Sequence, residues 1–122
     1  MKVKVKRLTS PAELSDILLK IPDTLVQWVV ENSSNPKVYI LAEMDADNLI
    51  GYVVAIDSVA PPVSDYFTVL FCGLDTAAVF DELSKIAKSN GAAQIVMIAS
   101  KMTDDLENLG FKQLSVNVGR SL

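Results

Sequence analysis

The stretch FCGLDTAAVF, residues 71–80, leads from an apolar run into a helical pattern. The run before it, Asp65 to Cys72, is apolar on both alternating faces, which predicts a central strand covered on both sides. The expected faces are Phe67, Val69 and Phe71 on one side and Tyr66, Leu70 and Cys72 on the other. We interpret Gly73 as the turn that ends this strand.

A helix is predicted from Thr76 to Asn90, directly after the strand. Its apolar stripe consists of Val79, Leu83 and Ile86, flanked by Phe80 and Ala87. Gly91 follows as a C-terminal cap, and Gln94 to Ser100 reads as another buried strand. A strand, helix and strand of this length predict a right-handed crossover between parallel strands. Because many α/β enzymes bind phosphate where a strand meets a helix, this junction is the first candidate site.

Composition limits the classes of protein that the chain can represent. Its 122 residues suffice for one domain with a single core. No apolar run approaches the roughly 18 to 20 residues of a membrane span, and the opening MKVKVKR lacks the apolar core of a signal peptide. We therefore expect a soluble, cytoplasmic protein with no membrane partner. Cys72 is the only cysteine and histidine is absent, which excludes Ser-His-Asp, Cys-His and zinc-histidine chemistry, and we expect no metal site.

The net charge of −4 is distributed unevenly along the chain. Four of the eleven basic residues lie in the first seven positions: Lys2, Lys4, Lys6 and Arg7. Between Lys37 and Lys85 there is no basic residue, whereas the acids there are Glu43, Asp45, Asp47, Asp57, Asp65, Asp75, Asp81 and Glu82. Such a segment repels polyanions, so we expect no nucleic-acid partner.

The first third of the chain predicts one strand and two helices. Residues 2–8 alternate lysine with apolar residues, as expected for an edge strand with one solvated face. Ser10, Pro11 and Glu13 have the spacing of a capping box, which predicts a helix to about Lys20. After Pro22, a second helix is expected, with Asp23 as its cap, extending to about Glu31 and burying Trp28 in the core.

The middle of the chain predicts an antiparallel hairpin. Residues 37–44 and 49–59 read as strands, and residues 45–48 form a polar turn of hairpin length. The second strand is apolar on both faces, with Ile50, Tyr52, Val54 and Ile56 opposing Leu49, Val53 and Ala55, and it ends before Pro61. A short helix at 104–109 and a last strand around 114–118 complete the predicted order β-α-α-β-β-β-α-β-α-β. The fold class expected is α/β (α+β), with helices on both faces of a single mixed, mostly antiparallel sheet of six to seven strands.

This order resembles that of the GNAT superfamily of acyl-CoA-dependent N-acyltransferases, over residues 1–122 as a single domain. Three local features carry the resemblance alongside the order: Gly51 within a strand, the helix ending SNGA at 89–92, and LGF at 109–111. An unrelated small α/β fold is the alternative. The resemblance implies a cofactor whose pyrophosphate binds at the start of the helix after the fourth strand, on a loop rich in glycine and containing arginine or glutamine.

The corresponding residues here depart from that loop. Residues 72–76, CGLDT, are several residues shorter and contain neither arginine, glutamine nor lysine, and only Gly73 as glycine. As the expected helix cap, Asp75 would accept hydrogen bonds from the amides that a phosphate needs and would repel it. Leu106 stands where many family members have a proton-donating tyrosine.

The remaining side chains that could take part in catalysis are interpreted mainly as ordinary structural residues. The tyrosines, Tyr39, Tyr52 and Tyr66, are expected in strands as core residues. The candidate bases are Asp57, Glu43 and Asp65, for which turns, salt bridges or solvated positions are the alternatives. Cys72 is expected to be a small buried residue, because no cation is near it in sequence to lower its pKa.

Two functions follow from the resemblance. In the first, the chain is a GNAT-like protein without the usual pyrophosphate site, acting as a binding or assembly module, with a homo-oligomer formed through its last strand or the helix face around Trp28. In the second, it is an N-acetyltransferase that uses acetyl-CoA or CoA mainly through the pantetheine arm. The cofactor-binding candidates are Phe71, Cys72, Gly73 and Thr76; no catalytic residue is assigned.

Overall fold

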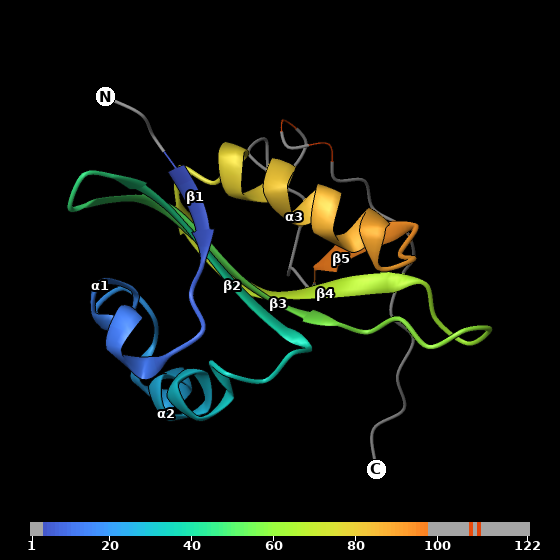
Figure 1. Ribbon diagram of the computed structural model, residues 1–122, viewed down its shortest axis with the longest axis horizontal. Helices are drawn as coiled ribbons and strands as arrows, with labels where there is room; N and C mark the ends of the chain where they lie inside the picture. Colours follow the sequence, from blue (N-terminus) through green and yellow to red (C-terminus); the bar gives the residue numbers. More distant parts are fainter. Residues whose placement is uncertain (1–3, 98–107, 109, 111–122) are drawn as a thin grey trace, which may run out of the picture.

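The computed structural model describes residues 4–97, Asn108 and Gly110, and its central element is a five-stranded sheet with the order β1-β2-β3-β4-β5 (Figure 1). The strands are β1 (Lys4–Arg7), β2 (Val38–Asp45), β3 (Asn48–Asp57), β4 (Tyr66–Leu74) and β5 (Gln94–Met97). The first three pairings are antiparallel and β4 pairs with β5 in parallel. The predicted mixed, mostly antiparallel sheet is confirmed, but the described residues form five strands where six to seven were predicted, and the strand expected at 114–118 lies outside them.

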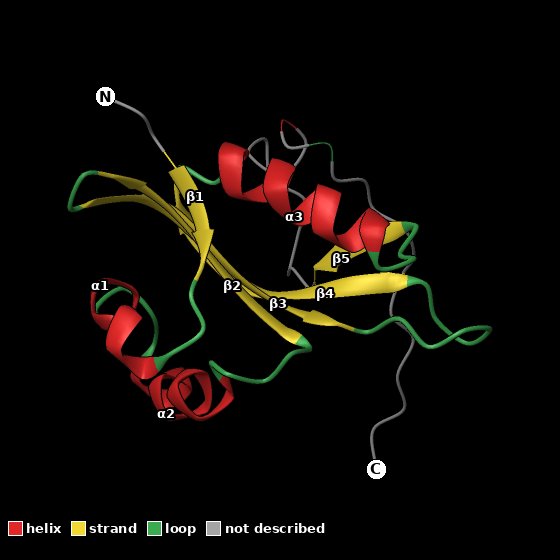
Figure 2. Cartoon of the chain, viewed as in Figure 1, coloured by secondary structure: helices red, strands yellow, loops and turns green. Residues whose placement is uncertain are grey.

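Helices cover both faces of this sheet (Figure 2). A 3₁₀ turn (Pro11–Glu13), α1 (Ser15–Leu18) and α2 (Asp23–Asn32) lie on one face, and α3 (Ala77–Ser89) lies on the other. On the α1/α2 face, Leu14, Ile17 and Val29 pack against the sheet. On the α3 face, Val79, Phe80, Leu83 and Ala87 pack against residues that include Val53, Phe67 and Val69. Within residues 4–97, no helix is both long and apolar enough to cross a membrane.

The element order agrees with the predicted one as far as β5. The crossover from β4 through α3 to the parallel strand β5 is present. The helix expected at 104–109, of which only Asn108 is described, and the strand expected at 114–118 lie outside the described residues. Gly91 follows α3 with φ of +87°, the conformation expected of a glycine that ends a helix.

The first helix differs from the prediction. The capping-box spacing predicted one helix from residue 11 to about residue 20, whereas the structure has a 3₁₀ turn followed by only four residues of α1. The Glu13 carboxylate accepts bonds from the Thr9 amide and the Ser10 hydroxyl, at 3.2 and 3.1 Å, so Ser10 donates to Glu13 and makes no side-chain cap bond. The bond from the Thr9 amide is the main reason that the pKa of Glu13 is lowered. The second helix also differs at its start. Asp23 was expected as its cap but is the first residue of α2, and Pro22 is in the cap position.

Two irregularities in the ladder move side chains to the face opposite the predicted one. The β2–β3 register shifts after Glu43, and Leu49 consequently packs on the α1/α2 face. The β3–β4 register shifts between Val54 and Ala55, which leaves Leu70 outside the pairing. Phe71 therefore packs on the α1/α2 face and Cys72 on the α3 face, contrary to strict alternation.

Candidate functional site

The junction between β4 and α3 is shorter than the sequence suggested. We interpreted Gly73 as the turn, but β4 continues through Leu74 and Gly73 lies in the strand opposite Tyr52. The chain reverses at Leu74, which has φ of +65° and is 56% exposed. Only Asp75 and Thr76 separate the last residue of β4 from the first residue of α3.

The backbone of Asp75 is held against β3. Its amide donates a hydrogen bond to the carbonyl oxygen of Ile50, at 3.1 Å. Its own carbonyl lies so close to Gly51 that a methyl group at that position would overlap the carbonyl oxygen. Gly51, which carries part of the family resemblance, is therefore the residue that lets this junction close onto the sheet.

Asp75 was expected as the cap of α3, but it is the residue before the cap, and its side chain still bonds to the start of the helix. Thr76 is the cap residue and makes no side-chain cap bond. Asp75 Oδ1 accepts a hydrogen bond from the amide of Ala77, the first residue of α3, at 3.3 Å. The first free amide of the helix is thus in contact with a carboxylate, in the position that a bound anion would need.

The four predicted cofactor-binding residues do not share one face. Phe71 packs with the α1/α2 core, where its ring meets the ring of Tyr52 edge-on with a centroid distance of 6.3 Å. Cys72 packs against the α3 core, and burial raises the pKa of its thiol, which disfavours the nucleophilic thiolate at neutral pH. Gly73 follows Cys72 in β4, opposite Tyr52, and Thr76 caps α3. A ligand along this stretch would meet mainly the backbone of β4.

Tyr52 is a neighbour of the site that sequence analysis placed only in the core. Its ring lies over Gly73, where a methyl group would come within 2.6 Å of the hydroxyl oxygen. The hydroxyl donates a long hydrogen bond, 3.4 Å, to the carbonyl oxygen of Lys20. Burial is the main cause, and Cys72 a smaller one, of the raised pKa of Tyr52. The signal in the sequence was a glycine within an apolar strand, which often marks a close approach.

The candidate bases do not converge on this junction as a group. Asp57 Oδ1 accepts a bond from the amide of Val59, at 2.9 Å, in agreement with the turn role. Asp65 precedes β4, at the end opposite Asp75, and its side chain accepts a 3.4 Å bond from Gln94. Glu43 lies opposite Gly51, so of these three acids it is the one that the sheet register brings nearest to the junction.

The other tyrosines of the prediction lie in strands, as expected. Tyr39 is buried on the α3 face, with the Arg7 guanidinium 4.0 Å from its ring centroid and the Phe67 ring centroid at 5.4 Å. Tyr66, at the start of β4, is half-buried. Leu106 lies outside the described residues.

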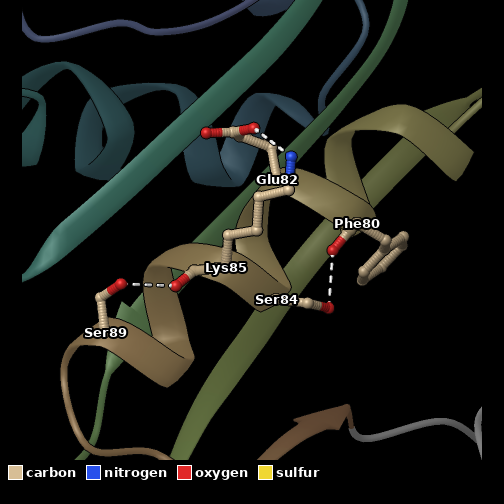
Figure 3. Close-up of polar contacts among 5 residues, drawn as sticks. All are labelled: Phe80, Glu82, Ser84, Lys85 and Ser89. Carbon is tan, nitrogen blue, oxygen red and sulfur yellow. Dashed lines mark hydrogen bonds and ion pairs between the residues drawn. The ribbon is translucent and has the colours of Figure 1, made fainter.

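Four polar side chains of α3, Glu82, Ser84, Lys85 and Ser89, make contacts within the helix (Figure 3). The hydroxyl of Ser84 donates to the carbonyl of Phe80 and that of Ser89 to the carbonyl of Lys85, at 2.8 and 2.9 Å. Lys85 pairs with Glu82 across an exposed 3.9 Å contact, which contributes little to stability. Lys85 is also the first basic residue after Lys37, so α3 supplies no cation in its first two turns.

Leu74→Gly is expected to raise the free energy of unfolding by about 1 kcal/mol, because glycine adopts a positive φ without strain and Leu74 buries little surface. Urea denaturation followed by circular dichroism measures the change. Leu70→Gly is the matched control, since Leu70 is also an exposed leucine of β4 but has no positive φ, and there glycine should destabilise. Equal destabilisation by both substitutions would contradict the strain at Leu74.

Comparison with known proteins relates the chain to others by structure alone. No protein-family model matches the sequence, and no curated protein matches it with statistical significance. An aminoglycoside 6′-N-acetyltransferase of Acinetobacter baumannii is similar with a TM-score of 0.72 and 12% identity, over 99% of each chain. A ribosomal-protein-alanine N-acetyltransferase of Brucella melitensis biovar Abortus 2308 has a TM-score of 0.68 and 16% identity, over 99% of this chain and 100% of that one.

A third similar structure is an aminoglycoside acetyltransferase from an uncultured soil metagenomic sample. It has a TM-score of 0.70 and 14% identity, over 100% of this chain and 99% of that one. Likeness at such low identity bears on the fold and leaves the chemistry open. The chain has a GNAT-like fold.

Proposed function

We propose that this GNAT-like protein does not bind acyl-CoA through its pyrophosphate and acts as a binding or assembly module instead of an efficient N-acyltransferase. The observation that carries the proposal is the two-residue connection between β4 and α3, with the Asp75 carboxylate on the Ala77 amide. Fold inheritance alone would favour catalysis, but catalysis in this family depends mostly on placing the cofactor.

The physical argument concerns the amides at the start of α3. Free amides at a helix N-terminus and the helix dipole attract anions, and glycines let the backbone approach a phosphate closely. Here Asp75 bonds to the first amide, and the position before it is leucine. A carboxylate about 4 Å from a phosphate costs about 1 to 4 kcal/mol, and the lower figure applies to an exposed group such as Asp75.

The second candidate function is N-acetylation with acetyl-CoA held mainly by its pantetheine arm along Phe71, Cys72, Gly73 and Thr76. Its support is the structural likeness to acetyltransferases. The opposite orientations of Phe71 and Cys72 weaken it, because both side chains pack into cores and leave mainly backbone atoms for a ligand.

Isothermal titration with acetyl-CoA separates the two functions. We expect a dissociation constant no tighter than about 1 mM, because the junction offers few free amides and one repelling charge. Asp75→Asn removes the charge and keeps an oxygen that can accept the Ala77 bond, so it should not restore tight binding. Asp23→Asn, at the exposed first residue of α2 on the opposite face of the sheet, is the matched control.

A micromolar dissociation constant for the unaltered protein would overturn the proposal in favour of the acetyltransferase. Micromolar binding by Asp75→Asn alone would mean that the charge, and not the short connection, keeps the cofactor out. If Asp75→Asn and Asp23→Asn increased the affinity for acetyl-CoA equally, the increase would come from the change in net charge and not from the junction.

A measurement of self-association tests the proposal that the protein is an assembly module. Among the described residues, Leu19 and Val63 are large apolar side chains that are 84% and 88% exposed, whereas Trp28 packs against the core. We expect light scattering after size-exclusion chromatography to give a mass above that of the 13.2 kDa monomer. Leu19→Ser and Val63→Ser, each at a side chain that buries little, test whether either surface lies in the contact. A monomer at high concentration would contradict assembly with a second copy.

A further inference from the structure

We draw no further inference here: the strongest candidate, the acidic end of the sheet where Glu43, Asp45 and Asp47 of the β2–β3 hairpin approach Asp75 at the start of α3, is a group of exposed or half-buried carboxylates, and among the described residues no second feature shows which ligand it would take.

Discussion

Replacing Gly51 with alanine is expected to lower the free energy of unfolding by about 3 kcal/mol, because the new methyl group would overlap the backbone carbonyl of Asp75. A flexible side chain could move away, but this carbonyl belongs to a junction of two residues between β4 and α3. Either the hydrogen bond from the Asp75 amide to Ile50 or the position of the helix must change. Urea denaturation followed by circular dichroism measures the loss.

Gly91→Ala serves as the control for this substitution. Gly91 has φ of +87° with open space around the position of the added methyl group, so alanine there should cost only the backbone strain, about 1 to 2 kcal/mol. Amide hydrogen exchange adds a local readout, since in Gly51→Ala the Asp75 amide should exchange faster if its bond to Ile50 is lost. A loss for Gly51→Ala no larger than that for Gly91→Ala would contradict the close approach.

The order of elements could be predicted because each signal was local. Apolar alternation and turn residues gave the β2–β3 hairpin, and the stripe of Val79, Leu83 and Ile86 gave α3. The faces of β4 could not be predicted in the same way. Leu70, which has no partner in the β3–β4 ladder, reverses the alternation after it, whereas strict period-two counting assumes that every residue of that ladder pairs.

The first helix shows a second limit of local patterns. Ser10 and Glu13 have capping-box spacing, but a capping box requires the serine to accept a bond from a helix amide. In the structure the serine donates to Glu13 instead, and the helix after it is short. Residue spacing therefore indicated that Ser10 and Glu13 lie close together, without predicting that their side chains would bond to each other and that Ser10 would leave the helix amides uncapped.

In the candidate site, too, local features could be predicted from the sequence and contacts between distant segments could not. The lack of arginine, glutamine and extra glycines at 72–76, and the carboxylate of Asp75, could be read directly from the sequence. The roles of the two glycines could not, because each depends on a segment distant in the chain. Gly51 makes room for the Asp75 carbonyl and Gly73 for the Tyr52 ring, so these contacts appear only once β3 and β4 are paired.

Replacing Gly73 with alanine is expected to lower the free energy of unfolding by about 2 kcal/mol, because the methyl group would press on the ring and hydroxyl of Tyr52. The neighbour here is a side chain, which can give way more easily than the backbone carbonyl at Gly51, so the loss should be smaller. Urea denaturation of both alanine variants under the same conditions gives the comparison.

A double-mutant cycle with Tyr52→Leu identifies the contact responsible. If the Tyr52 ring causes the loss, Gly73→Ala should cost less by about 1 kcal/mol or more when leucine is present at position 52. Tyr39→Leu provides the matched background, because Tyr39 is also a buried tyrosine of the sheet but packs on the α3 face, away from Tyr52. In that background the two losses should add. If the losses from Gly73→Ala and Tyr52→Leu were additive, the Tyr52 ring would not be the cause of the loss. Gly73 would then be required by the backbone of β4 and not by its contact with the phenol ring.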